Sequence, residues 1–432
     1  MVGFSFTLLY IALSYIFPGE IVPELAPYKI TLAVGVIGLL VSFGRACTHG
    51  RLSVGRPQVY YLLALTIVIS LSVLWADRWF GGALDAFQDF GVSLTTFFLV
   101  IWNVDTLKKL YVVIGLMVIL SLFLSIQGIA AFHYGYKKEQ LIIADVPEEN
   151  SDEDPETAAP VLRIRGFGIM NDPNDLALGL MTSLPLLMLA WRKKVLRIVI
   201  TTAVAATLSY GIYLTHSRGA ALSVLVIVFT AAMPRMGKIK SAFATLLLAS
   251  ALLAANISGG RAMTSEDDSA AGRIESWSEG IQMLKENPVL GVGYHNYVEH
   301  NRLTAHNSFV LCFAELGLLG FFCWMGLLVA TFRQLKAILA ASAVLAHLRR
   351  LANALRVTLF GFLTGAFFLS RTYIPLLYLL IGLGVALFDI VGRDAAVEKA
   401  RPAALGMSVI AWTLGGVCFM YAFVRLNTMF VK

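Results

Sequence analysis

Two arginines and a histidine stand at places in this sequence where charged side chains could act on a substrate. Arg273 and Trp277 are four residues apart, so they share one face of a short predicted helix. His306 follows a glycine-containing loop and precedes a long apolar segment, and Arg218 precedes another such segment. A guanidinium group binds phosphate oxygens through two parallel hydrogen bonds, and helix N-termini favour anions. These residues therefore indicate recognition of a phosphorylated substrate.

The composition shows that such residues must be positioned by membrane helices. Of the 432 residues, 58% are hydrophobic and 14% are charged, with a mean hydropathy of +0.75, whereas soluble chains have about 25% charged residues. Apolar runs long enough to cross, or nearly cross, a bilayer core of about 30 Å predict an all-α polytopic membrane protein with about 12–13 transmembrane helices. The runs are Phe4–Phe17, Tyr28–Phe43, Val59–Trp75, Ala83–Trp102, Leu110–Phe132, Asp175–Trp191, Val195–Leu214, Gly219–Met233, Ala242–Ala255, Ser308–Phe332, Leu351–Leu369, Tyr373–Ile390 and Ala404–Val424.

The charged residues also exclude several classes of function. The net charge of +7 comes without a basic block, so a nucleic-acid partner is not indicated. The four cysteines lie in or beside apolar runs, and no three histidines and carboxylates have metal-ligand spacing. We therefore expect no metal and no cofactor.

The basic residues predict the orientation of the chain, since lysine and arginine concentrate in cytoplasmic loops. Alternate loops are basic, and the loops between them contain acidic residues. The two long polar segments, Gly135–Arg165 and Asn256–Ala305, then face outward, and the acidic run Glu148–Glu156 is expected to be a solvated loop. The longer of them should hold short helices.

Seven arginines on the outward side have no role in setting this orientation. They are Arg163, Arg165, Arg218, Arg261, Arg273, Arg302 and Arg371. Ionisable residues at the ends of membrane helices indicate a functional site. The alternative is that some of them neutralise nearby acids or contact lipid headgroups.

A turn before one apolar run combines glycine, asparagine and aspartate. Asp172 and Pro173 suit the N-cap and the first position of a helix, while Asn171 and Asn174 could hydrogen bond to a sugar or a phosphate. Capping is the alternative explanation for all of these polar residues. Asp85 and Asp89 lie four apart in another run, and either line a polar cavity or pair with an arginine.

The order of these motifs resembles the O-antigen ligase family, which includes Wzy-type polymerases and bacterial protein O-oligosaccharyltransferases. His306-Asn307 is followed after nine residues by Gly317 and then Gly320. The motifs Asp172-Pro173-Asn174, Ser217-Arg218-Gly219 and Gly272-Arg273 are also similar to this family, over roughly Arg163 to Phe332. The acidic insert Asp145–Glu156 matches no motif of the family, and the last apolar run leaves the C-terminus outside, whereas the ligases are expected to have twelve spans.

The resemblance implies a glycosyltransferase-C-like enzyme at the periplasmic face of the bacterial inner membrane. Such an enzyme transfers a glycan from undecaprenyl pyrophosphate to an acceptor hydroxyl, with lipid A-core as our first choice. The resemblance assigns the catalytic roles to His306, Arg273 and Arg218. The arginines would stabilise the leaving diphosphate, and a neutral His306 would take the proton of the hydroxyl, so that the anomeric centre inverts. We expect substrate contacts from Arg163, Arg165, Asn171, Asn174, Trp277, Asn307 and Arg371.

Other functions fit part of the same pattern. Repeat-unit polymerisation and protein O-glycosylation use the same donor, and a flippase could bind the anionic lipid without chemistry, although no paired internal repeat is evident.

A ligase of this kind would divide into three parts. They are N-terminal transmembrane helices (1–132), a ligase core with two periplasmic loops at 133–167 and 256–305 (133–332), and C-terminal transmembrane helices (333–432).

Overall fold

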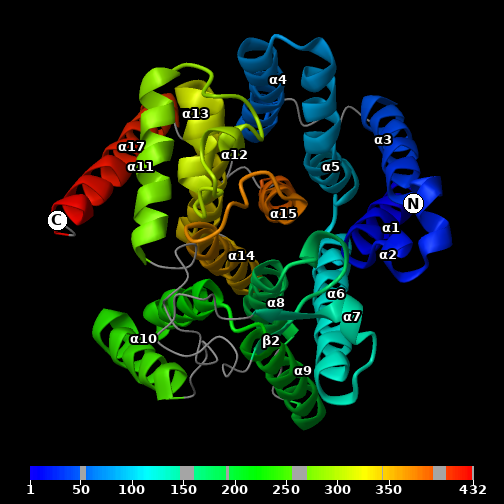
Figure 1. Ribbon diagram of the computed structural model, residues 1–432. Coiled ribbons are helices and arrows are strands. Elements are labelled where there is room, and N and C mark those ends of the chain that lie inside the picture. Colours follow the sequence, from blue (N-terminus) through cyan, green and yellow to red (C-terminus); the bar gives the residue numbers. More distant parts are fainter. Residues whose placement is uncertain are drawn as a thin grey trace. The chain divides into compact units, whose positions relative to one another are not determined.

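The computed structural model describes residues 1–48, 55–145, 160–190, 194–254, 270–342, 344–392 and 405–430. Over these residues the fold is helical apart from a single two-stranded sheet (Figure 1). Nine helices of the described part are long and apolar enough to cross a membrane. The chain is therefore an all-α polytopic membrane protein, as the composition predicts.

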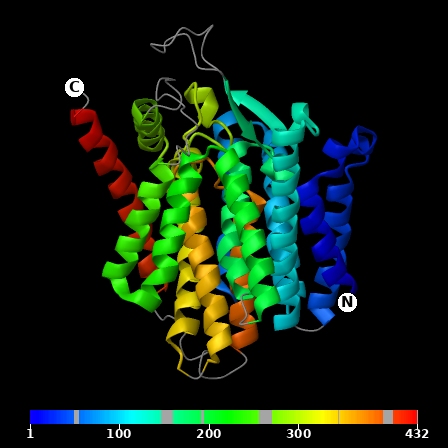
Figure 2. The same ribbon diagram turned by 90° about the horizontal axis from the view of Figure 1, so that it is seen from below.

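The remaining expected spans are also helical. They are not counted as separate long apolar helices because they are joined across a kink, short or charged. Gly219–Met233 and Ala242–Ala255 are two arms of one element, α10 (Arg218–Ala254), which changes direction at Gly237 (Figure 2). The helices α8 (Pro173–Leu187) and α15 (Pro375–Val391) have only 15 and 17 residues. The helix α14 (Ala346–Ala366) contains three arginines.

The chain divides into two compact units, each built from three separated stretches. Unit 1 contains Met1–Ser42, Asn103–Ala262 and Ser342–Gly365, and unit 2 contains Phe43–Trp102, Met263–Ala341 and Ala366–Lys432. The three-part division expected from the motifs remains a prediction.

In unit 1, α6 packs against α1, α8 and α9, and α8 also packs against α10. Ser121 and Ser183 join α6 to α8 through a hydrogen bond of 2.8 Å between their hydroxyls. The elements of this unit are α1 (Val2–Ile16), α2 (Pro18–Ile21), η1 (Pro23–Tyr28), most of α3 (Ile30–Thr48), α6 (Leu107–Tyr134), α7 (Lys138–Leu141), β1 (Ile142–Asp145), β2 (Val161–Ile164), η2 (Gly168–Met170), α8, η3 (Met188–Ala190), α9 (Val195–Leu214), α10 and most of α14.

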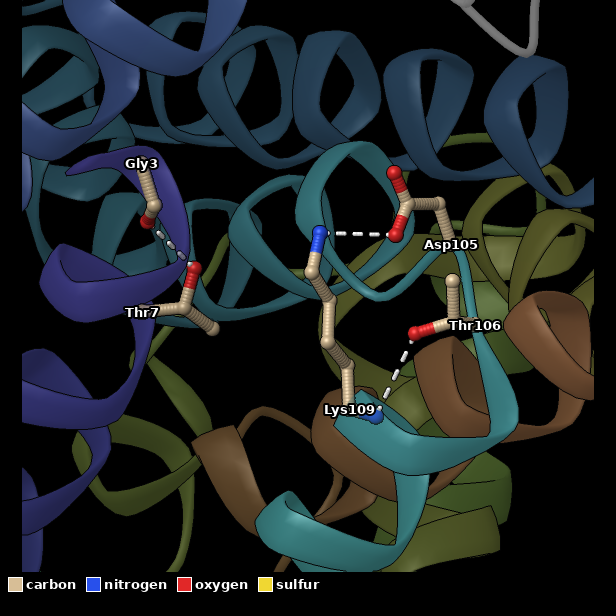
Figure 3. Close-up of polar contacts among 5 residues, drawn as sticks. All are labelled: Gly3, Thr7, Asp105, Thr106 and Lys109. Carbon is tan, nitrogen blue, oxygen red and sulfur yellow. Dashed lines mark hydrogen bonds and ion pairs between the residues drawn. The ribbon is translucent and has the colours of Figure 1, made fainter. Parts of the chain in front are cut away.

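Figure 3 shows the polar contacts at the start of α6, which packs against α1. Thr106 is the N-cap of α6, and its side chain accepts a hydrogen bond from the backbone of Lys109. The ammonium group of Lys109 pairs with Asp105 at 2.7 Å and lies 5.4 Å from the ring centre of Phe4 in α1. The Thr7 hydroxyl donates a hydrogen bond to the Gly3 carbonyl within α1. The two helix ends are thereby held together.

The strands β1 and β2 pair antiparallel, with Asp145 opposite Val161. The acidic run Glu148–Glu156 falls between them but lies outside the described residues. Ile164 at the end of β2 is buried and faces Gly128 of α6, where a Cβ would meet its side chain at 2.8 Å. The hairpin therefore closes onto the end of α6.

In unit 2, α13 (Ser308–Ala340) is central and packs against α4, α11, α15 and α17 (Figure 1). A hydrogen bond of 2.7 Å between Gln58 and Gln334 joins α4 to α13 within the apolar interior. The other elements are α4 (Pro57–Asp77), α5 (Phe80–Asn103), α11 (Ala270–Glu286), α12 (Tyr297–His300), α15 and α17 (Leu405–Phe430).

The helix α13 is broken at Gly317, where φ is 62° and ψ is −165°. These dihedrals are accessible essentially only to glycine. A Cβ at this position would also meet the Val289 carbonyl oxygen at 2.3 Å. The break exposes helix carbonyls and amides that need partners.

The loop after α11 supplies those partners. Backbone amides of Val292 and Gly293 donate to the carbonyls of Ala314 and Glu315 at 2.9 and 3.0 Å. On the other side of the break, Leu318 donates to Pro288 at 2.8 Å. The loop thus completes the backbone hydrogen bonding of α13 at the break, and the break sets the position of the loop.

Candidate active site

The helix that carries Arg273 is anchored to the chain just before His306. Trp277, only 4% exposed, donates from its indole N–H to the Ala305 carbonyl at 2.9 Å. Its ring also contacts Phe367 and Phe423, with centroids 5.4 and 5.7 Å away. Arg273 is half-buried one turn earlier on the same helix face.

A tyrosine provides a second anchor for this helix. The Tyr297 hydroxyl donates to the Ser276 carbonyl in α11. Burial raises the pKa of Tyr297, so the phenol stays protonated and remains a hydrogen-bond donor. The helix α11 ends at Glu286, directly before Asn287-Pro288, since a proline cannot continue a helix.

His306 stands in a tight turn at the entrance of α13. Its φ of 45° is in the left-handed region, which is uncommon for residues other than glycine. Asn307 then caps the helix, and its Oδ1 accepts from the backbone amides of Phe309 and Val310 at 2.9 and 3.1 Å. The imidazole is therefore held beside the positive end of α13.

Asn307 has a second feature besides the cap. It is completely buried, and within the described ranges its Nδ2 has no hydrogen-bond partner. A buried amide of this kind requires an acceptor. The hydrogen bonds show Asn307 as the cap of α13. Its contact with substrate stays a prediction.

The turn that carries Arg371 is tied to the residue after Asn307. The backbone amide of Arg371 donates to the Ser308 hydroxyl at 2.7 Å, and that hydroxyl donates to the Leu369 carbonyl at 2.6 Å. The Thr372 hydroxyl donates to the Ser308 carbonyl at 2.7 Å. Arg371 is thus held next to the His306 segment.

A side-chain pair adds to the same connection. The Thr304 hydroxyl donates to the Ser370 hydroxyl at 2.7 Å. Three segments, carrying Arg273, His306 and Arg371, are therefore joined at the short stretch Ala305–Ser308. This arrangement lies wholly within unit 2.

The remaining arginines with a predicted role lie in unit 1. Arg163 is 5% exposed, and it donates to the Thr215 carbonyl at 2.8 Å and to the Asn174 side-chain oxygen at 3.1 Å. It braces the turn that leads to Arg218, the first residue of α10. Ser217, before Arg218, accepts a hydrogen bond from the Ala220 amide at 3.4 Å.

The polar residues before α8 have separate positions. Asp172 is the N-cap, since its Oδ1 accepts from the amides of Asn174 and Asp175 at 2.7 and 3.3 Å, and Pro173 is the first helical residue. The capping prediction is confirmed. Arg165 donates to the Gln140 carbonyl at 2.7 Å, and Asn171 is exposed.

The predicted residues therefore form two groups, one in each unit. Unit 2 brings together His306, Arg273, Trp277, Asn307 and Arg371, and unit 1 contains Arg163, Arg165, Asn171, Asn174 and Arg218. Asp85 and Asp89 are exposed on α5. No group of three histidine, cysteine or acidic side chains that could hold a metal occurs in the part of the chain that the structure describes.

Residues 203–325 match the model of the O-antigen ligase family. This segment of the chain is similar to the O-antigen ligase family. The match includes Arg218, Arg273 and His306, and it ends before Arg371. No curated protein has a matching sequence. The match supports glycan transfer of the ligase or polymerase type in general, between a glycan-linked lipid donor and an acceptor.

Proposed function

We propose that this protein transfers a glycan from undecaprenyl pyrophosphate to a hydroxyl group of lipid A-core, in line with its similarity to the O-antigen ligase family. The observation that carries the proposal is the joining of the segments with Arg273, His306 and Arg371 at Ala305–Ser308. Two guanidinium groups suit a diphosphate, and an imidazole suits a hydroxyl proton.

The reaction is proposed to occur at the periplasmic face of the bacterial inner membrane. Basic residues such as Arg45, Lys108 and Arg333 lie near alternate connections of the helices, at the end of α3, at the start of α6 and towards the end of α13. Such connections stay in the cytoplasm. The loop before α13 then faces the periplasm, where a lipid-linked glycan and lipid A-core meet.

In the proposed step, the acceptor hydroxyl oxygen attacks the anomeric carbon of the donor. The bond from that carbon to the phosphate oxygen breaks, and undecaprenyl pyrophosphate leaves with the bonding electrons. Arg273 and Arg371 bind the phosphate oxygens and stabilise the charge that develops on them. The same role for Arg218 is proposed from the family motif and from its place at the N-terminus of α10.

His306 is proposed as the general base of this step. It directly precedes the N-cap of α13, and an imidazole within hydrogen-bond reach of the acceptor hydroxyl can accept its proton. Direct attack places the new bond on the opposite face of the sugar, so the anomeric configuration inverts. The buried Nδ2 of Asn307 is proposed to donate to an oxygen of the substrate.

Cells that carry or lack the intact gene test the proposed donor and acceptor. In cells without the gene we expect lipid A-core to lose its long glycan while undecaprenyl-linked glycan accumulates in the periplasmic leaflet. Loss of glycan from a protein, or of a long secreted polymer, would instead assign an O-oligosaccharyltransferase or a polymerase. Accumulation in the cytoplasmic leaflet would indicate a flippase.

A further inference from the structure

A buried glutamate lies at the break of α13. Glu315 is 2% exposed and is two residues before Gly317. A carboxylate in such a place is costly unless hydrogen bonds satisfy it. Its Oε2 accepts from the Tyr373 hydroxyl at 2.8 Å, and its backbone carbonyl accepts from the Gly293 amide at 3.0 Å.

These donors belong to two different loops. Gly293 belongs to the loop that fills the break in α13, whereas Tyr373 is two residues after Arg371. Glu315 therefore links the two loops through side-chain and backbone donors. An apolar side chain could fill the same volume, but it would not accept the Tyr373 hydroxyl and so would not fix the turn after Arg371.

The turn with Arg371 is held at both of its ends. Before Arg371, Ser370 and Leu369 are tied to Thr304 and Ser308. After Arg371, the Tyr373 hydroxyl is tied to Glu315. The guanidinium group is thus carried by a short turn with little freedom between two fixed points.

The ring of Tyr373 is packed independently of its hydroxyl. It makes edge contacts with Tyr294 and Phe90, with centroids 4.7 and 6.4 Å away. Removal of the hydroxyl alone leaves these contacts in place. The hydrogen bond to Glu315 can therefore be tested without removing the ring.

We propose that Glu315 is a positioning residue that acts through Tyr373 to hold Arg371 against a phosphate of the lipid-linked donor. This inference rests on the proposed function, and it adds a specific role. Glu315 and Tyr373 determine the affinity for the diphosphate and do not contact the acceptor. Preorganised donors bind more tightly because less freedom is lost on binding.

The test measures binding of undecaprenyl pyrophosphate to the purified full-length protein in lipid nanodiscs. This probe needs no knowledge of the sugar or the acceptor. We expect Tyr373→Phe and Arg371→Ala each to raise the Kd about tenfold, which corresponds to one strong hydrogen bond. The double variant should be no weaker than Arg371→Ala, because Tyr373 acts through Arg371.

Two further variants make the test specific. Tyr61→Phe removes a hydroxyl from a ring that packs against Phe322 beyond the break in α13, and it should leave the Kd unchanged. Glu315→Gln keeps one acceptor for Tyr373 and should bind more tightly than Glu315→Leu. Thermal melting in nanodiscs identifies any variant that fails to fold.

Two results would overturn the inference. One is a Kd of Tyr373→Phe equal to that of the wild type, and the other is a double variant whose losses add. Failure of the wild-type protein to bind undecaprenyl pyrophosphate would instead count against the proposed function itself.

Discussion

Replacement of His306 by alanine is expected to abolish glycan transfer, with a loss of at least about 100-fold in turnover, the lower end of what general base catalysis contributes. In the proposed step, the imidazole is the group that accepts the proton of the attacking hydroxyl. The measurement is turnover of the purified variant with a lipid-linked glycan and an acceptor.

The backbone of His306 requires a second variant. Its left-handed φ of 45° is strained for alanine, so the loss could reflect folding. Asparagine tolerates this conformation and has no basic nitrogen, and His306→Asn should be as inactive as His306→Ala while melting like the wild type. His300→Ala removes an exposed histidine and serves as the control. Full activity of His306→Asn would disprove the catalytic role.

Replacement of Arg273 by lysine is expected to lower turnover on the order of 100-fold, the effect of losing one donor to a developing charge. Lysine keeps the positive charge but lacks the planar fork that binds two phosphate oxygens. The anchor of α11 at Trp277 stays in place, so the change is local to the side chain.

The control for Arg273 is Arg302→Lys, the same change at an exposed arginine of the loop before α13. It should retain normal turnover. If Arg273→Lys also turned over normally, the guanidinium group would be a contact for lipid headgroups and not a ligand of the leaving group.

Local features of the fold could be predicted from the sequence because they depend on neighbouring residues. The Asp172-Pro173 start of α8 and the end of α11 before Pro288 follow from capping and from the geometry of proline. The entrance of α13 after His306 follows from the onset of an apolar run. Each of these signals lies within a few residues of the feature that it determines.

Features that depend on distant residues could not be predicted in this way. The break at Gly317 lies inside an apolar run, and hydropathy carries no information about φ. Ser308 and Arg371 are joined by hydrogen bonds across a long sequence separation that no pattern marks. Glu315 is likewise an isolated acid in an apolar helix, and only the positions of its donors reveal its role.

Arg163 shows the same limit for a candidate site residue. Its sequence position on the outward side predicts a substrate contact, but two of its donors are used on Thr215 and Asn174. The direction of a buried guanidinium group depends on the packing of α8 and α9, which lie beside it only in the folded unit. Its contribution to substrate binding stays a prediction.

The most direct measurement of the central claim is the anomeric configuration of the linkage made by the purified protein. The protein is reconstituted in liposomes with an undecaprenyl pyrophosphate-linked glycan of known configuration and with lipid A-core, in the presence of a chelator, and the product is analysed by NMR. The account predicts an inverted linkage and one released undecaprenyl pyrophosphate for each bond formed. A retained configuration, or movement of the donor across the bilayer without transfer, would contradict it.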